Sequence, residues 1–327
     1  MRIVITGGAG FLGQRLARAI LQRPTLNDAR GEAQPIEQVT LLDAATPPTS
    51  IDDPRVRMVV GDIADAAVID EVVQPNTDSV FHLAAVVSGQ AEADFDLGMR
   101  VNLDATRLLL ERCRTLRAPP KFVFTSSLAV YGGELPDPVP EDMRLMPQTS
   151  YGSQKAIGEL LVYDMTRKGF IDGRSLRLPT VTVRAGKPNR AASSYASGII
   201  REPLNGEAAV CPVTPQTRMW VISPRSVIHN IVLAHEAPAS AFGSTRSIVL
   251  PGLSVSAQQM VDALRRVAGD RVADRVKWQV DPVIDRIVST WPPAFAPSLA
   301  LALGMKADPD FDTIVRQYIA DEQPRGL

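Results

Sequence analysis

Thr6-Gly7-Gly8-Ala9-Gly10-Phe11-Leu12-Gly13 is the stretch of sequence that decides the fold. It follows the apolar run Arg2–Thr6, which predicts a buried strand, and it opens the segment Phe11–Leu21, whose apolar spacing predicts a helix. A tight glycine turn lets backbone N–H groups approach a pyrophosphate at the helix start, and its last glycine permits close helix–strand packing. The position of this GxGxxG pattern therefore predicts a dinucleotide site, with contacts from Gly7, Gly10, Phe11, Leu12 and Gly13.

The chain beyond this turn alternates two hydrophobic periodicities. Short β-branched runs predict strands at Arg2–Thr6, Gln38–Asp43, Val56–Gly61, Ser79–Ala84 and Lys121–Ser126. Helical spacing predicts helices at Phe11–Leu21, Ala64–Val73, Met99–Leu116 and Ser150–Arg167. The strand runs are apolar without in–out alternation, which is typical of strands that helices cover on both faces. We therefore expect an α/β fold with a doubly wound parallel sheet of the Rossmann type.

The later sequence changes in character and predicts a second, smaller part. Residues 1–185 are expected to form the cofactor-binding Rossmann domain, and segments near 218–250 are expected to return to it. Residues 186–327 are expected to be mainly a substrate-binding part, because Lys187–Asn205 is rich in Ser, Ala and Asn. The polar stretch between Pro24 and Glu37 predicts a surface insertion after the first helix.

Composition excludes several classes of protein. Of 327 residues, 45% are apolar and 22% are charged, which is ordinary for a globular chain. Thirty-five Lys and Arg oppose 36 Asp and Glu, so the net charge of −1 predicts neither a nucleic acid nor a membrane partner. Two cysteines and three histidines form no disulfide framework and no metal-binding pattern. No apolar run reaches about 18 residues, and no leader precedes the first strand, so a cytoplasmic protein is expected.

The ends of the next strands supply candidate cofactor contacts. Asp43 ends the second strand, where a carboxylate binds the adenosine ribose; no cation follows it directly, which favours NAD over NADP. Asp62, followed by Ile63, ends the third strand and either accepts from the adenine amino group or caps the next helix. Leu83-Ala84-Ala85 lets the backbone pass close to the dinucleotide. His82, inside an apolar run, is interpreted as a core histidine.

Tyr151-Gly152-Ser153-Gln154-Lys155 places a phenol and an ammonium four residues apart at the start of a predicted helix, hence on one face. A phenol with its ordinary pKa near 10 needs help to transfer a proton at neutral pH, and a nearby ammonium and a positive nicotinamide ring both lower that pKa. Ser127 follows the fifth strand, whose end faces the ligand crevice. These three side chains are therefore predicted to converge around one cofactor ring, where Ser127 holds the reacting oxygen of the substrate and Tyr151 exchanges its proton.

Together these motifs resemble the extended short-chain dehydrogenases/reductases, a family of NAD-dependent epimerases, dehydratases and dehydrogenases. The resemblance implies that Ser127, Tyr151 and Lys155 are catalytic, with Ser126 as the alternative serine. It also implies a role for Asn102 in Val101-Asn102-Leu103 and places Pro179 beside the nicotinamide. In this family a pair of helices matching Met99–Leu116 and Ser153–Arg167 often forms a dimer interface, so a homodimer is expected, although core packing explains their apolar stripes equally well.

The residues after Ser127 separate the possible reactions. Leu128-Ala129 stands where the family's dehydratases carry Asp-Glu, so the acid and base for water elimination are missing. The segments 184–198, 201–206 and 223–225 are similar to a narrower branch, the D-erythronate dehydrogenases, which oxidise the C2 hydroxyl of a four-carbon sugar acid. Candidate substrate contacts, besides Ser127 and Tyr151, are Ser88, Arg184, Asn189, Ser193 and Arg218.

Three alternatives stay open at this point. A nucleotide-sugar epimerase would keep NAD bound and release no net NADH. A dehydrogenase or reductase of another small substrate would use the same catalytic residues. A non-catalytic dinucleotide-binding sensor would be expected to lack Tyr151 or Lys155, and both are present.

Overall fold

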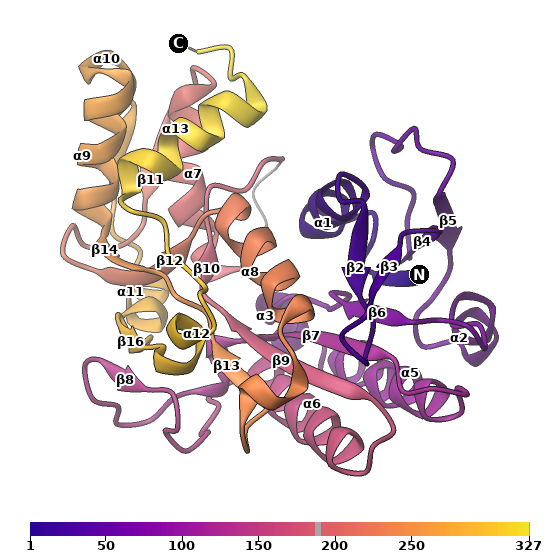
Figure 1. The fold of residues 1–327 in the computed structure, drawn as a ribbon. Coiled ribbons are helices and arrows are strands. Elements are labelled where there is room, and N and C mark those ends of the chain that lie inside the picture. Colours follow the sequence, from indigo (N-terminus) through magenta and orange to yellow (C-terminus); the bar gives the residue numbers. More distant parts are fainter. Residues whose placement is uncertain (187–190, 327) are drawn as a thin grey trace.

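The computed structural model describes residues 1–186 and 191–326 and contains a central sheet of seven parallel strands (Figure 1). The order across this sheet is β13, β9, β7, β6, β1, β4, β5, and every neighbouring pair runs parallel. Its strands are β1 (Arg2–Thr6), β4 (Gln38–Asp43), β5 (Val56–Val60), β6 (Ser79–His82), β7 (Lys121–Ser127), β9 (Asp172–Leu178) and β13 (Ser247–Val249). The predicted doubly wound sheet is confirmed, and the strand order reverses between β1 and β6.

Helices cover both faces of the sheet because residues alternate between faces along each strand. Ile3 and Ile5 of β1 pack with α1 (Phe11–Leu21) and α8 (Pro224–Glu236) on one face. Val4 packs on the other face, in a core that the remaining helices of the sheet complete. These helices are α2 (Ala66–Val72), α5 (Ala105–Arg114) and α6 (Ser150–Arg167).

A second hydrophobic core lies in the C-terminal part of the chain, and Figure 1 shows α7, α9, α10 and α13 grouped on one side of the molecule. The helices of this part are α7 (Tyr195–Leu204), α9 (Ala257–Ala268), α10 (Asp270–Ala273), α11 (Pro282–Ser289), α12 (Ser298–Ala302) and α13 (Phe311–Glu322). Its strands are β10 (Thr180–Val181), β11 (Ala209–Cys211), β12 (Arg218–Ile222), β14 (Leu253–Ser256), β15 (Val276–Trp278) and β16 (Phe295–Ala296). Helix α12 packs instead with the core of the central sheet.

Several local predictions differ from the structure. The polar insertion forms a short antiparallel hairpin of β2 (Thr25–Asn27) and β3 (Ala33–Pro35). The stretch rich in Ser, Ala and Asn contains α7, for which no helix was predicted, because its apolar residues face the second core. The single helix predicted over Met99–Leu116 begins instead as a π-helical stretch, Met99–Asp104, before α5. Three more short elements are α3 (Ser88–Ala93), α4 (Phe95–Gly98) and β8 (Val139–Pro140).

Candidate active site

The glycine turn lies at the point where the strand order reverses. Gly7 has a φ of +70°, which only glycine adopts readily, and a Cβ there would lie 2.9 Å from the backbone nitrogen of Ala84, just beyond β6. A Cβ on Gly13 would lie 2.1 Å from the carbonyl oxygen of Gly7. The turn is therefore closed against both α1 and the end of β6, and it leaves the first N–H groups of α1, from Phe11 and Leu12, as donors for an anion.

Asp43 ends β4 beside this turn, as predicted. Its Oδ2 accepts a hydrogen bond from the backbone N–H of Ala9 at 3.0 Å, and its Oδ1 accepts a longer one from Ala45 at 3.4 Å. A carboxylate has about four acceptor positions, so the Asp43 side chain can still accept from ribose hydroxyls. The glycine cradle and this carboxylate together fit an adenine dinucleotide such as NAD.

Asp62 lies after β5 and does not cap the following helix. Asp65 caps α2 by accepting from Ala67, so the capping alternative for Asp62 is wrong. Asp62 accepts from the backbone N–H of Ala64 at 2.9 Å and pairs with Arg100, and these two interactions lower the pKa of its carboxyl. Ile63 is buried, and a contact of Asp62 and Ile63 with adenine stays a prediction.

His82 is a core residue, as the sequence indicated. It is fully buried at the end of β6, between the hydroxyls of Thr6 at 2.7 Å and Thr106 at 2.8 Å. Burial and the charge of Lys155 lower its pKa to about 3, so the ring is neutral at physiological pH. The backbone of Leu83, Ala84 and Ala85 continues from it past the glycine turn.

Tyr151, Lys155 and Ser127 come together where α6 meets the end of β7. The Oγ of Thr149 caps α6 by accepting from Gly152 at 3.1 Å. A Cβ on Gly152 would lie 2.2 Å from the carbonyl oxygen of Ala129, so the start of α6 lies against the chain directly after Ser127. The Ser127 hydroxyl lies near the Tyr151 phenol and acts to lower its pKa. The Nζ of Lys155 lies 5.7 Å from the centre of the Tyr151 ring.

Burial dominates the electrostatics of this group. It raises the pKa of Tyr151 to about 12, although the nearby Ser127 hydroxyl opposes the increase. It lowers the pKa of Lys155 to about 7, although the charge of Glu159 opposes the decrease. Lys155 donates to the carbonyl oxygen of Thr125 at 2.9 Å. The expected lowering of the phenol pKa by the ammonium is therefore not present in the protein alone.

Asn102 is buried in the π-helical stretch, and its side chain is fully engaged within the protein. Its Oδ1 accepts from the N–H of Val86 at 2.8 Å, and its Nδ2 donates to the carbonyl of Val86 at 3.1 Å and to Gln154 at 2.8 Å. It thus joins the segment after β6 to α6, between Tyr151 and Lys155. These bonds hold the Asn102 side chain in place, and its expected catalytic and cofactor-binding roles stay a prediction.

The candidate substrate residues fall into different environments. Arg184 follows β10, and burial, with a smaller contribution from Arg201, lowers the pKa of its guanidinium. Among residues 1–186 and 191–326, no acceptor binds that guanidinium. Arg218 is instead engaged already, by Asp137 at 3.0 Å and by Ser254 at 2.8 Å.

The remaining candidates are spread along the chain. Ser88 is partly buried at the start of α3, and Ser193 is partly buried in a 3₁₀ turn before α7. Pro179 lies between β9 and β10. Asn189 falls outside the described residues. Their contact with substrate stays a prediction.

Sequence reasoning missed a buried group behind the catalytic residues. Glu159 lies one helical turn beyond Lys155 and binds Ser126 and Arg177. Arg177 also donates to the phenol oxygen of Tyr131. The spacing of Tyr151, Lys155 and Glu159, four residues apart each time, is the sequence signal that places all three on one helix face.

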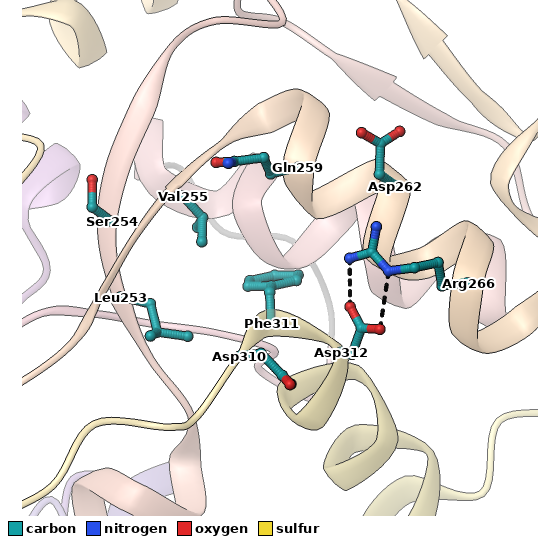
Figure 2. A pocket seen from close by; sticks show the side chains of 9 residues that line it. All are labelled: Leu253, Ser254, Val255, Gln259, Asp262, Arg266, Asp310, Phe311 and Asp312. Carbon is teal, nitrogen blue, oxygen red and sulfur yellow. Dashed lines mark hydrogen bonds and ion pairs between the residues drawn. The ribbon is translucent and has the colours of Figure 1, made fainter.

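A cavity of about 310 Å³ lies elsewhere, between α9 and α13 (Figure 2). Arg266 reaches Asp312 in a two-bond ion pair beside it, with distances of 2.6 and 3.0 Å. None of the predicted site residues lines this cavity. The described residues contain no cluster of side chains suited to a metal ion, and none of their helices has the length and apolarity to cross a membrane.

Comparisons with known proteins agree with this geometry. The model of the NAD dependent epimerase/dehydratase family matches residues 3–241. The chain is 57% identical over 98% of its length to a D-erythronate dehydrogenase of Cupriavidus necator, and covers 98% of that protein. It is 44% identical over 98% of its length to a D-erythronate dehydrogenase of Haemophilus influenzae, and covers 99% of it.

A solved structure gives the same picture of the fold. The crystal structure described as the nucleoside-diphosphate-sugar epimerase from Agrobacterium tumefaciens superposes with a TM-score of 0.93 at 39% identity, over 99% of this chain and 94% of that one. The glycine cradle, the sheet and the Tyr–Lys helix thus occur together with close sequence similarity over the whole chain. The chain belongs to the NAD dependent epimerase/dehydratase family, among the extended short-chain dehydrogenases/reductases, and is an NAD-dependent oxidoreductase.

Proposed function

We propose that this protein oxidises the C2 hydroxyl of a small sugar acid, D-erythronate or a close analogue, to the 2-oxo acid. The observation that carries the proposal is the convergence of Tyr151, Ser127 and Lys155 at the end of β7, close in the fold to the glycine turn. The names of the two relatives at 57% and 44% identity supply the substrate class.

NAD, held by the glycine turn and Asp43, supplies the hydride acceptor. The reaction removes one hydrogen from C2 and one from its hydroxyl oxygen: the C2–H bond breaks and its electron pair leaves with the hydrogen as hydride, while the O–H proton leaves as the C=O bond forms. Tyr151, as the phenolate, accepts that proton, and Ser127 donates a hydrogen bond that fixes the reacting oxygen. Lys155 stabilises the phenolate by its charge and donates to a ribose hydroxyl. Asn102 positions α6 through Gln154.

The substrate carboxylate is assigned to Arg184. An arginine is well suited to bind a carboxylate, and Arg184 is partly buried with no acceptor for its guanidinium in the described part of the chain. Arg218 is a weaker candidate because Asp137 and Ser254 already occupy its guanidinium. Ser88, Asn189 and Ser193 are retained as candidate partners for the hydroxyls.

Epimerisation of a nucleotide sugar is the second candidate, because the Agrobacterium tumefaciens structure at 39% identity carries that description. The higher identity to the two dehydrogenases favours net oxidation. Dehydration is disfavoured, since Leu128 and Ala129 offer neither an acid nor a base after Ser127.

A homodimer is also proposed. Helix α6, which also carries Tyr151, exposes three apolar or aromatic side chains spaced three residues apart. These are Ile157, Leu160 and Tyr163, whose exposed fractions are 41%, 65% and 42%. An apolar face of this kind on a helix of the sheet supports association with a second copy.

The deciding experiment is a panel of four- and five-carbon sugar acids with NAD, followed by the absorbance of NADH. We expect D-erythronate to be oxidised most efficiently. Erythritol, which has the same carbon number but no carboxylate, is the matched control and should give less than a hundredth of the rate. Absence of NADH with every acid, together with interconversion of a nucleotide sugar by protein that retains NAD, would establish the epimerase alternative instead.

A further inference from the structure

Three consecutive residues at the end of β7 hold three residues of α6. The carbonyl of Thr125 accepts from Lys155 at 2.9 Å, and the hydroxyl of Ser126 donates to Glu159. The hydroxyl of Ser127 lies near the phenol of Tyr151 and acts to lower its pKa. The phenol, the ammonium and the carboxylate thus stand in one row along the helix, each held by its own residue of the strand.

Glu159 is held more firmly than its neighbours in this row. It is 3% exposed, and Arg177 donates to its two oxygens from Nε at 3.0 and 3.1 Å and from Nη2 at 2.7 Å. Arg177, on β9, is itself fixed by the phenol oxygen of Tyr131 and the carbonyl of Glu141. With this many donors, the carboxylate of Glu159 cannot rotate away from its place on α6.

Lys155 has few other sources of stabilisation for its charge. Its ammonium is 1% exposed, bonds to one carbonyl, and lies over the rings of Phe124 at 4.6 Å and Tyr151 at 5.7 Å. The negative charge of Glu159 raises the pKa of Lys155 against the effect of burial. Without Glu159, an ammonium so placed would lose its proton at a lower pH.

We propose that Glu159, fixed by Arg177 and Ser126, is a positioning residue that keeps Lys155 charged and directed at Tyr151. The inference rests on the proposed function, because it assigns Glu159 to the same catalytic row. It adds a fourth residue that acts on the reaction without touching substrate or cofactor.

The test replaces the charge and keeps the shape. Glu159→Gln retains most of the hydrogen-bonding geometry, so Lys155 should be the group that changes. We expect kcat at pH 7 to fall about tenfold, and the alkaline limb of the kcat/KM profile to move about one unit toward lower pH. Glu159→Asp, which restores the charge, should recover most of the lost activity and the original profile.

The matched control is a carboxylate on β9, the strand that carries Arg177. Asp172→Asn removes the carboxylate partner of Arg174, the other buried arginine of β9, at the opposite end of the sheet. It should leave the pH profile unchanged although it removes a buried ion pair. A Glu159→Gln profile like that of the wild type, or an equal displacement in Asp172→Asn, would make Glu159 purely structural and overturn the proposal.

A measurement without substrate separates this inference from the proposed function. The ¹³Cε resonance of Lys155 in wild-type protein, identified by its absence in Lys155→Met, should titrate with a midpoint at or above neutral pH. A midpoint below pH 6 would contradict the inference whatever the sugar-acid panel gives. If Glu159→Gln does not fold, this titration of the wild-type protein still tests whether Lys155 is charged at neutral pH, as the inference requires.

Discussion

The two ends of the central sheet each bury a lysine, but they surround it differently. Lys155 lies at the carboxyl ends of the strands, and Lys121 begins β7 at the amino ends. Burial lowers the pKa of both, to about 7 for Lys155 and to about 8 for Lys121. Each donates to one backbone carbonyl, Thr125 at 2.9 Å and His235 at 2.7 Å respectively.

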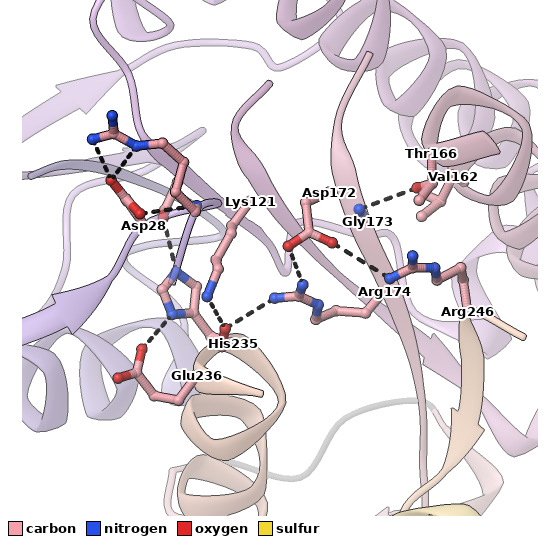
Figure 3. Close-up of polar contacts among 12 residues, drawn as sticks. Asp28, Lys121, Val162, Thr166, Asp172, Gly173, Arg174, His235, Glu236 and Arg246 are labelled. Atoms are coloured by element: carbon pink, nitrogen blue, oxygen red, sulfur yellow. Dashed lines mark hydrogen bonds and ion pairs between the residues drawn. The ribbon is translucent and has the colours of Figure 1, made fainter. Parts of the chain in front are cut away.

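The neighbours distinguish the two lysines. At the amino end, Lys121 and Arg174 both donate to the carbonyl of His235, near the end of α8, where the helix dipole favours cations (Figure 3). Asp172 and Glu236 add negative charge, so this cluster is neutralised within the protein. Lys155 lies instead beside the phenol of Tyr151, at the end of the sheet that also carries the Ser127 hydroxyl and the glycine turn. A lowered lysine pKa therefore does not identify a site without a reactive partner beside it.

The largest expected effect comes from a substitution at the carboxyl ends of the strands, which should abolish activity without affecting the amino ends. Tyr151→Phe removes the proton acceptor, and general acid–base groups contribute about 10²–10⁴ in rate, so we expect kcat/KM to fall by about 10³. Affinity for NAD, measured by fluorescence titration, should change less than twofold. Tyr163→Phe, an exposed tyrosine on the same helix, is the control and should keep wild-type activity. Substantial turnover by Tyr151→Phe would refute its assignment as the base.

The next largest effect comes from a substitution at the amino ends of the strands, which should lower stability without affecting the catalytic residues. Arg174→Met leaves Asp172 without its closest cation and the His235 carbonyl with only Lys121. Removal of one partner from a buried ion pair costs about 3 kcal/mol in the free energy of unfolding, measured by urea denaturation. The KM values should stay as in the wild type. Arg167→Ala, which breaks an exposed pair with Asp164, should cost less than about 1 kcal/mol. A large rise in KM with Arg174→Met would mean that the two ends are not independent.

The smallest effect concerns pH and includes one histidine from each end. Burial lowers the pKa of His82 to about 3 and that of His235 to about 4. Unfolding exposes them to their ordinary pKa near 6.5, so the unfolded chain binds more protons below that pH and stability falls with acidification. Each histidine should cost the fold about 2 kcal/mol at pH 5 relative to pH 7.

Urea denaturation at both pH values measures this dependence. His235→Gln should reduce it by about half, because His82 remains. His229→Gln, at an exposed position of α8, should leave it unchanged. A dependence equal to that of the wild type in His235→Gln would contradict the neutral state of His235 in the folded protein.

Local sequence patterns predicted the strands of the sheet up to β7 and the shared helix face of Tyr151 and Lys155. The run from Arg2 to Thr6, the glycine turn and the Tyr151–Lys155 spacing each carry their meaning within a few residues, so periodicity and turn chemistry suffice. His82 was likewise interpreted correctly from the apolar strand around it.

Pairings between distant segments were not predictable in this way. Arg218 looked available for a carboxylate until the fold placed Asp137 beside it. For Asp62 the sequence allowed either an adenine contact or a helix cap. In the structure α2 starts later, with Asp65 as its cap, and Asp62 pairs with Arg100. The Glu159–Arg177 pair joins a helix to a strand 18 residues away, and only the packed structure brings them together.

Strand β13 has a consequence for biosynthesis. It enters the sheet from residues 247–249 and covers the edge of β9, while the carbonyl of His235 satisfies Lys121 and Arg174. While the ribosome is still making this region, the nascent sheet has an open strand edge and two buried cations without their acceptor. Such an edge is a hazard for intermolecular pairing. The sheet therefore cannot be completed until the last third of the chain has been synthesised. A chaperone that covers the open edge of β9 until then would prevent intermolecular strand pairing.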